Sequence, residues 1–286
     1  MFHFFGSGGK PSTLPVKVIC VGGASRSGKG TMAWMLRNAL SLPHWAVVHC
    51  DEFFDPIGIM NRYMDRLKQL ALKEEFLKYI EDDTEEQKKA REFASLPVGS
   101  VMIPQKLRNY IDEHGRPNER WQNWEEPAAM NWEDCQQVIR EAMARAAEEK
   151  VEYILVEGYT IMMKDWPMPQ VPCTKAIFMC IDKETSRTRR ARTKPVPEGY
   201  FEQLIWPEHI KAHRHLIPVM EALTSKNVCE SEMKEWIDKH GGDVLILDGT
   251  GDIDRLTQQA ISYIRDESKN RDRSSELELL RKAIKE

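Results

Sequence analysis

Short apolar runs alternate with longer amphipathic stretches along most of the chain. Five runs have the character of buried strands, at residues 16–21, 46–49, 151–156, 176–181 and 244–247. Apolar residues at helical spacing predict helices over residues 127–149, 185–192, 208–223 and 253–265. Continuous apolar strands that alternate with helices are typical of a mostly parallel sheet covered on both faces. The pattern therefore predicts the α/β class.

The same pattern divides the chain into segments. Residues 1–14 contain Gly-Ser-Gly-Gly and are predicted to form a flexible tail, and residues 15–265 are predicted to form the main domain. Within it, residues 57–120 interrupt the alternation: 62–96 is charged and helical in pattern with a narrow apolar stripe, whereas 97–124 is predicted to be irregular. We expect a solvated helical insertion here rather than a partner-binding helix. Residues 266–286 form a highly charged extension, which is predicted to be frayed or a short amphipathic helix.

A glycine-rich turn joins the first strand to the helix that follows it. Its spacing, Gly23-x-x-x-x-Gly28-Lys29, is that of a loop whose backbone N–H groups surround a phosphate. The helix N-terminus adds partial positive charge, and the lysine adds a full one. An ordinary strand–helix turn is the alternative. The predicted nucleotide-binding residues are Gly23, Ala24, Ser25, Arg26, Ser27, Gly28, Lys29, Gly30 and Thr31.

One position departs from the common form of this loop. Gly30 follows the lysine, where a serine or threonine usually binds Mg²⁺, and Thr31 comes one residue later. One residue on a helix is a rotation of about 100°, so Thr31 cannot simply take over that position. Adenylate-kinase-like loops also read Gly-Lys-Gly-Thr. We keep Thr31 as a candidate metal residue.

Acidic residues follow three of the predicted strands. Asp51, Glu157 and Asp248 all fall at carboxyl ends, where ligands bind in open parallel sheets. A phosphate loop beside such carboxylates is what Mg²⁺-dependent phosphoryl transfer requires. We therefore predict ATP and Mg²⁺ as cofactors. Asp51, Glu157 and Thr31 are the candidate metal residues.

A basic helix is predicted after the fourth strand. It carries Arg187, Arg189, Arg190 and Arg192, and the segment Pro195–Gly199 that follows resembles a closing lid. Guanidinium groups suit the stabilisation of charge on a transferred phosphoryl group. Arg189 and Arg192 are the catalytic candidates together with Lys29 and Asp51. The competing interpretation is a solvated basic helix.

Composition narrows the class of protein further. The 286 residues carry a formal net charge of −4 and six scattered cysteines with no CxxC motif, which argues against a nucleic-acid partner, a zinc site or a disulfide framework. No apolar run approaches the roughly 18 residues of a membrane helix. We expect an intracellular protein, in the cytoplasm or also the nucleus, with a small-molecule substrate. Self-association through the insertion or the C-terminal helix is left open.

The chain resembles the nicotinamide riboside kinase family, within the uridine-kinase-like P-loop kinases. The resemblance covers residues 16–56 and 121–265, whereas residues 57–120 are much longer than the connection usual in that family. The segment with glycine–tyrosine and tryptophan–proline pairs is the most specific match, and the phosphate loop is the least. The matching segments are 22–29, 50–54, 123–130, 154–159, 198–207 and 247–250.

The resemblance implies a role for each matching position. Asp51 corresponds to the acid that takes the proton of the ribose 5′-hydroxyl, and Glu157 to a carboxylate near Mg²⁺. Glu125 stands where the family has an aspartate that holds the ribose diol, and Trp124 where an aromatic ring stacks on nicotinamide. The resemblance also places adenine near Asp248 and Thr250, and Phe54 and Tyr200 on the substrate side.

The function implied is ATP-dependent phosphorylation of a ribonucleoside, nicotinamide riboside first, to give its mononucleotide in NAD salvage. The segment 193–198 lacks the aromatic residue that similar family members carry there, so the identity of the base stays open. One alternative is a kinase of uridine or a related nucleoside. Another is a nucleotide-binding regulatory protein without catalytic activity, which the insertion and Gly30 motivate.

Overall fold

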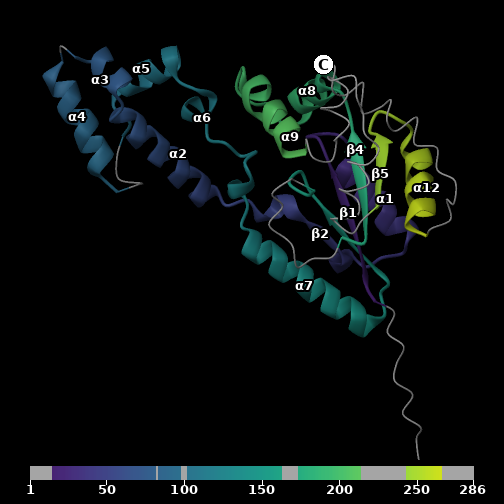
Figure 1. The fold of residues 1–286 in the computed structure, drawn as a ribbon. Helices are drawn as coiled ribbons and strands as arrows, with labels where there is room; N and C mark the ends of the chain where they lie inside the picture. Colours follow the sequence, from purple (N-terminus) through teal and green to yellow (C-terminus); the bar gives the residue numbers. More distant parts are fainter. Residues whose placement is uncertain (1–14, 82, 98–101, 163–172, 214–242, 266–286) are drawn as a thin grey trace, which may run out of the picture.

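The computed structural model describes residues 15–81, 83–97, 102–162, 173–213 and 243–265 (Figure 1). The predicted tail 1–14, the predicted extension 266–286 and the second half of the helix predicted at 208–223 lie outside the described residues. In the described part of the chain, no helix is long and apolar enough to cross a membrane.

Five parallel strands form one sheet in the order β2-β3-β1-β4-β5. All five predicted strands are present, each within three residues of the predicted bounds. The predicted fold class, an α/β parallel sheet built around a phosphate loop, is therefore confirmed. The strands are β1 (Lys17–Gly23), β2 (Val47–His49), β3 (Tyr153–Glu157), β4 (Lys175–Cys180) and β5 (Asp243–Asp248).

Helices cover both faces of this sheet. The chain passes from β1 outward to β2 and then back to β3, so right-handed crossovers place the intervening helices α1 and α7 on opposite faces. Helix α12 packs beside α1, and Figure 1 shows this pair on the other side of the sheet from α7. The bounds are α1 (Lys29–Ala39), α7 (Trp132–Glu149), α8 (Lys183–Thr193), α9 (Trp206–His213) and α12 (Ile253–Ile264).

In the described residues between β2 and residue 120, the chain folds into five α-helices that extend away from the sheet (Figure 1). The prediction of an irregular stretch at 97–124 is wrong for residues 105–120, which are largely helical. The stretch 62–96 is three helices rather than one, because the chain turns back twice. The helices are α2 (Pro56–Ala71), α3 (Glu74–Tyr79), α4 (Thr84–Ser95), α5 (Gln105–His114) and α6 (Pro117–Arg120).

These helices enclose a hydrophobic core separate from the one around the sheet. Leu67, Phe76, Phe93 and Leu107, from four different helices, are all buried in it. The apolar stripe of the sequence is thus the inner face of a small bundle. Both cores are built by the usual removal of apolar side chains from water.

The chain segments on either side of this helical insertion are paired with each other. Phe54 forms an isolated antiparallel bridge with Met130, and the Asp55 amide donates to the Ala129 carbonyl at 2.8 Å. The Asn131 amide donates to the Phe53 carbonyl at 2.7 Å. The chain therefore leaves the sheet shortly after Asp51 and returns to it shortly after the segment that contains Glu125.

Candidate functional site

A large cavity opens at the carboxyl ends of β1, β2 and β3. Its volume is about 1220 Å³, and residues from the phosphate loop, the acceptor loop (defined here as residues 121–126) and the lid side of α8 line it. The structure thus brings together residues that are far apart in the sequence. Of the predicted site residues, it contains Ser25, Arg26, Gly28, Lys29, Gly30, Thr31, Asp51, Phe54, Trp124, Glu125, Glu157, Arg189, Arg192 and Tyr200.

The phosphate loop has the conformation that its glycines predict. Gly28 has φ of 98° directly before α1, and Arg26 has φ of 61°. Left-handed residues of this kind let successive backbone N–H groups turn towards one concave site, as they do in an anion nest. Gly23 has another reason to be glycine, since a Cβ there would lie 2.2 Å from the Met179 carbonyl oxygen of β4. Gly23, Ala24 and Ser27 do not line the cavity. These three residues lie within the loop but away from the cavity surface.

Lys29 is buried at the base of this loop. Its Nζ donates to the Ala24 carbonyl at 2.9 Å. Burial lowers the pKa of Lys29, while the nearby carboxylates of Asp51, Glu157 and Glu125 act in the opposite direction. A cation held in a pocket of low polarity interacts strongly with any phosphate that enters.

Two acidic residues face the loop from the neighbouring strand ends. The Tyr159 amide donates to Asp51 Oδ1 at 3.1 Å, and a hydrogen bond of 2.8 Å joins Glu157 Oε1 to His49 Nδ1. The hydrogen bond with Glu157 raises the pKa of His49. A Cβ on Gly30 would lie 3.9 Å from Glu157 Oε1. Because position 30 is glycine rather than serine or threonine, no hydroxyl group stands between this carboxylate and the N-terminus of α1.

The donor set suits Mg²⁺ held mainly by a substrate. Among the described residues, no group of three histidine, cysteine or acidic side chains could hold a metal by itself. Asp51, Glu157 and Thr31 all line the cavity beside the phosphate loop. Mg²⁺ commonly binds through one or two carboxylates together with phosphates and water, and oxygen ligands of this kind are present here.

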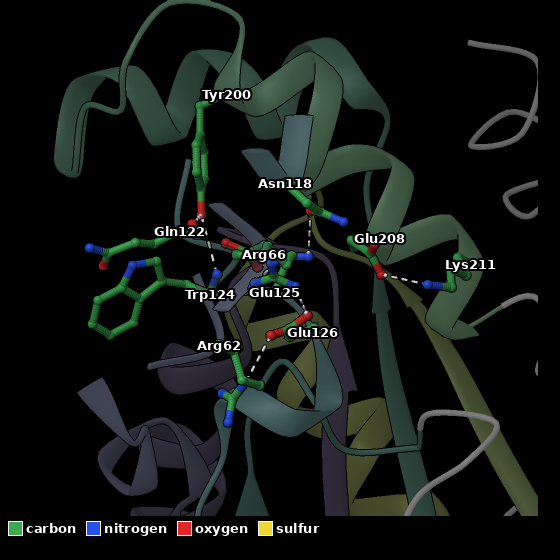
Figure 2. A network of polar contacts seen from close by, with 11 residues as sticks. Arg62, Arg66, Asn118, Gln122, Trp124, Glu125, Glu126, Tyr200, Glu208 and Lys211 are labelled. Carbon is green, nitrogen blue, oxygen red and sulfur yellow. Dashed lines mark hydrogen bonds and ion pairs between the residues drawn. The ribbon is translucent and has the colours of Figure 1, made fainter. Parts of the chain in front are cut away.

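Aromatic side chains form the opposite wall of the cavity. The rings of Phe54 and Trp124 meet edge to face at 5.9 Å between centroids. Tyr200 Oη donates to the Gln122 carbonyl at 3.1 Å and accepts from the Trp124 amide at 3.4 Å (Figure 2). Burial raises the pKa of Tyr200 to about 12, so its hydroxyl keeps the proton that it donates. Tyr200 thereby fixes the backbone beside Trp124.

Glu125 lies inside the cavity wall between the aromatic residues and α8. Only 6% of its surface is exposed, and its amide donates to Asn123 Oδ1 at 3.0 Å. Burial raises the pKa of Glu125 to about 7, and Arg190 is the strongest opposing influence. A buried carboxylate of this kind needs hydrogen-bond donors when it is charged. A ligand with paired hydroxyl groups would supply them.

The arginines of α8 differ in what they contact. Arg189 Nη1 donates to the carbonyls of Arg26 at 3.3 Å and Gly249 at 2.9 Å. Arg190 Nη1 donates to Ser25 Oγ at 2.9 Å, and its Nε is buried with no partner in the described structure. Sequence reasoning did not select Arg190. A basic helix gives no signal of which arginine faces inward before its neighbours are placed.

The turn after β5 lies outside the cavity lining. Asp248 Oδ1 accepts from the Thr250 amide at 2.9 Å and from Thr250 Oγ1 at 2.6 Å. A Cβ on Gly249 would lie 2.3 Å from the Ser27 carbonyl oxygen, so the turn packs directly on the back of the phosphate loop. An adenine contact for Asp248 and Thr250 stays a prediction.

Several further cavity residues come from the helical insertion and its return. Tyr63 lies on α2, Arg120 ends α6, and Trp121 follows it. Trp121 meets Tyr200 edge to face at 5.7 Å. The segment 193–197 also lines the cavity but contributes no aromatic ring. Extra aromatic surface thus comes from a part of the chain where the sequence suggested no chemistry.

Comparison with known proteins does not assign a family. No protein-family model matches the chain, and no curated protein matches it significantly. Solved structures with similarity include a sugar kinase from Janibacter, at 13% identity and a TM-score of 0.39 over 88% of this chain and 95% of that one. An uncharacterized protein from Eubacterium ventriosum is 16% identical, with a TM-score of 0.33 over 87% and 98% of the two chains. A Thermus thermophilus protein is 15% identical, with a TM-score of 0.32 over 89% and 99%. Values this low do not indicate a substrate.

Proposed function

We propose that the protein is an ATP-dependent nucleoside kinase that phosphorylates the ribose 5′-hydroxyl of nicotinamide riboside. The observation that carries the proposal is the position of Asp51, which lines one cavity with Lys29 on the phosphate side and Glu125 on the acceptor side. A triphosphate on the loop and a ribose on Glu125 would meet in front of Asp51. The aromatic wall would receive the cationic pyridinium ring.

Each cavity residue has a separate role in the proposed phosphoryl transfer. Asp51 takes the proton of the 5′-hydroxyl while that oxygen forms its bond to the γ-phosphorus, and the bond from this phosphorus to the leaving oxygen of ADP breaks. Lys29 and Arg190 neutralise charge on the phosphoryl oxygens. Glu157 and Asp51 would hold Mg²⁺, which neutralises phosphate charge when it is bound. The fixed Oδ1 of Asp51 leaves Oδ2 to receive the proton.

A direct assay tests the proposal. The protein is incubated with ATP, Mg²⁺ and either nicotinamide riboside or uridine, and the mononucleotide is detected by mass. Nicotinamide mononucleotide is the expected product. Preferred formation of uridine monophosphate would support the alternative nucleoside kinase. ATP binding with no phosphorylated nucleoside would support the regulatory alternative, which the glycine at position 30 favours.

Glu125 should set opposite pH dependences for binding and stability. Its charged form accepts hydrogen bonds from ribose, so the nucleoside KM should fall as the pH rises through about 7. The pKa of Glu125 is higher in the folded protein than in the unfolded chain. Its protonated carboxyl therefore contributes stability at pH values below the unfolded-state pKa, and this contribution is lost as the pH rises through about 7. Glu125→Gln should therefore raise Tm relative to wild type at pH 8 but not at pH 4.5, while it increases the nucleoside KM. Thermal melts and initial rates at both pH values measure the two effects.

Arg190 should matter more to turnover than Arg189. Arg190→Gln removes the guanidinium between Ser25 and Glu125, and we expect kcat to fall about 10²-fold. Arg189→Gln removes contacts to two backbone carbonyls, so the ATP KM should rise more than kcat falls. Steady-state kinetics of both variants distinguish the two roles. Equal losses of kcat would contradict the assignment.

A further inference from the structure

We propose that Arg62 and Arg66 of α2 are positioning residues that hold the acceptor loop through Glu126, so that the helical insertion is a working part of the acceptor site. The meaning for catalysis rests on the proposed function, whereas the contact itself does not. The sequence suggested only a solvated insertion in this region. The structure gives it a direct link to the residue beside Glu125.

Two arginines converge on one carboxylate. Arg62 Nε lies 3.0 Å from Glu126 Oε1, and Arg66 Nη1 lies 3.2 Å from Glu126 Oε2 (Figure 2). The arginines are four residues apart and therefore share one face of α2. Each oxygen of the carboxylate has its own cation, so Glu126 cannot rotate without breaking one contact.

This clamp (Arg62, Arg66 and Glu126) acts next to the acceptor carboxylate. Glu126 directly follows Glu125, whose amide is held from the other side by Asn123 Oδ1 at 3.0 Å. The Glu125 backbone is thus fixed at both ends. A backbone that is fixed in this way limits the positions that a buried side chain can take.

Helix α2 also connects the clamp to the catalytic side of the cavity. It begins at Pro56, five residues after Asp51, and the Asp55 side chain caps it by accepting from the Gly58 amide at 2.9 Å. Tyr63, next to Arg62, lines the cavity itself. Helix α2 therefore connects the segment that carries Asp51 to the loop that carries Glu125. This is the relation that an attacking hydroxyl would depend on.

The clamp is poorly arranged as a source of stability. Arg62 Nη2, Arg66 Nε and Arg66 Nη2 are buried and have no hydrogen-bond partner in the described part of the chain. Buried donors without partners cost free energy, and ion pairs of partly exposed side chains contribute little. The clamp should therefore influence where the loop lies more than how stable the protein is.

The test combines hydrogen exchange with kinetics. In the double variant R62Q/R66Q, amide exchange in residues 121–131 should become at least about tenfold faster. The nucleoside KM should rise about tenfold, while the ATP KM stays within about twofold of wild type. R62K/R66K should restore most of the affinity for nucleoside. Glu126→Gln should reproduce the loss, and it decides the question if the double variant does not fold.

A matched control removes an ion pair elsewhere. Lys17 pairs with Glu152 at 3.0 Å, and both side chains are partly exposed like those of the clamp. Lys17→Gln should change neither exchange in 121–131 nor the nucleoside KM. Unchanged exchange in R62Q/R66Q overturns the proposal, and so does faster exchange with an unchanged nucleoside KM. If wild-type protein phosphorylates no nucleoside, the proposed function fails, and the exchange measurement, which needs no substrate, still decides the clamp.

Discussion

Asp51→Asn should lower kcat for nucleoside phosphorylation by about 10²- to 10⁴-fold, the range for loss of a general base. The asparagine Oδ1 can still accept the Tyr159 amide that now holds Asp51 Oδ1 at 3.1 Å. The side chain should therefore keep its place while losing the ability to take a proton. ATP affinity should change little, because the phosphate loop is untouched and Glu157 remains to hold Mg²⁺. The rate of product formation gives kcat, and calorimetric titration with ATP gives the affinity.

Glu52 provides the control for this experiment. It neighbours Asp51 on the same short turn, Cys50–Phe53, and is exposed, but it does not line the cavity. Glu52→Gln removes the same charge at almost the same distance from the sheet. We expect it to retain wild-type turnover. Substantial turnover by Asp51→Asn would mean that another group accepts the proton, and the catalytic assignment would be wrong.

Local sequence patterns were sufficient for the parts of the fold that depend on local physics. A strand buried on both faces must be apolar throughout, so runs such as Val18–Val21 indicate a central strand before any partner is known. The phosphate loop was equally visible, because its backbone requires glycine at Gly28, where φ is 98°. Asp51 and Glu157 could be placed in one site because parallel strands end at the same edge of a sheet.

The insertion was harder because its core depends on contacts between distant segments. Leu107 and Ile111 lie in a polar stretch, and only their packing against Leu67 and Phe76 reveals a helix with a buried face. Tyr63 in the cavity wall and the clamp on Glu126 depend on the same folding. The choice of Arg190 over its neighbours has a similar cause, since it depends on the angle at which α8 meets Ser25.

Lys29→Met should abolish most of the activity without weakening the fold. Methionine has a similar length and suits a buried position, whereas the lysine is charged and only 7% exposed. Burial lowers the pKa of Lys29, so the folded protein holds its charge less favourably than the unfolded chain does. The substitution relieves this cost at neutral pH, and Tm should stay the same or rise. The loss of a cation at the phosphates should lower kcat about 10²- to 10³-fold and raise the ATP KM.

Differential scanning fluorimetry and steady-state rates together distinguish this outcome from simple unfolding. Lys17→Met is the comparison, because it removes a partly exposed lysine at the start of β1, the end away from the phosphate loop. Its partner there is Glu152. It should leave both rate and ATP KM at wild-type values. If Lys29→Met lost activity only in proportion to a lower Tm, the lysine would serve the fold through its bond to the Ala24 carbonyl. A higher Tm with little activity would instead mean that the protein tolerates a buried charge because a phosphate has to be held there.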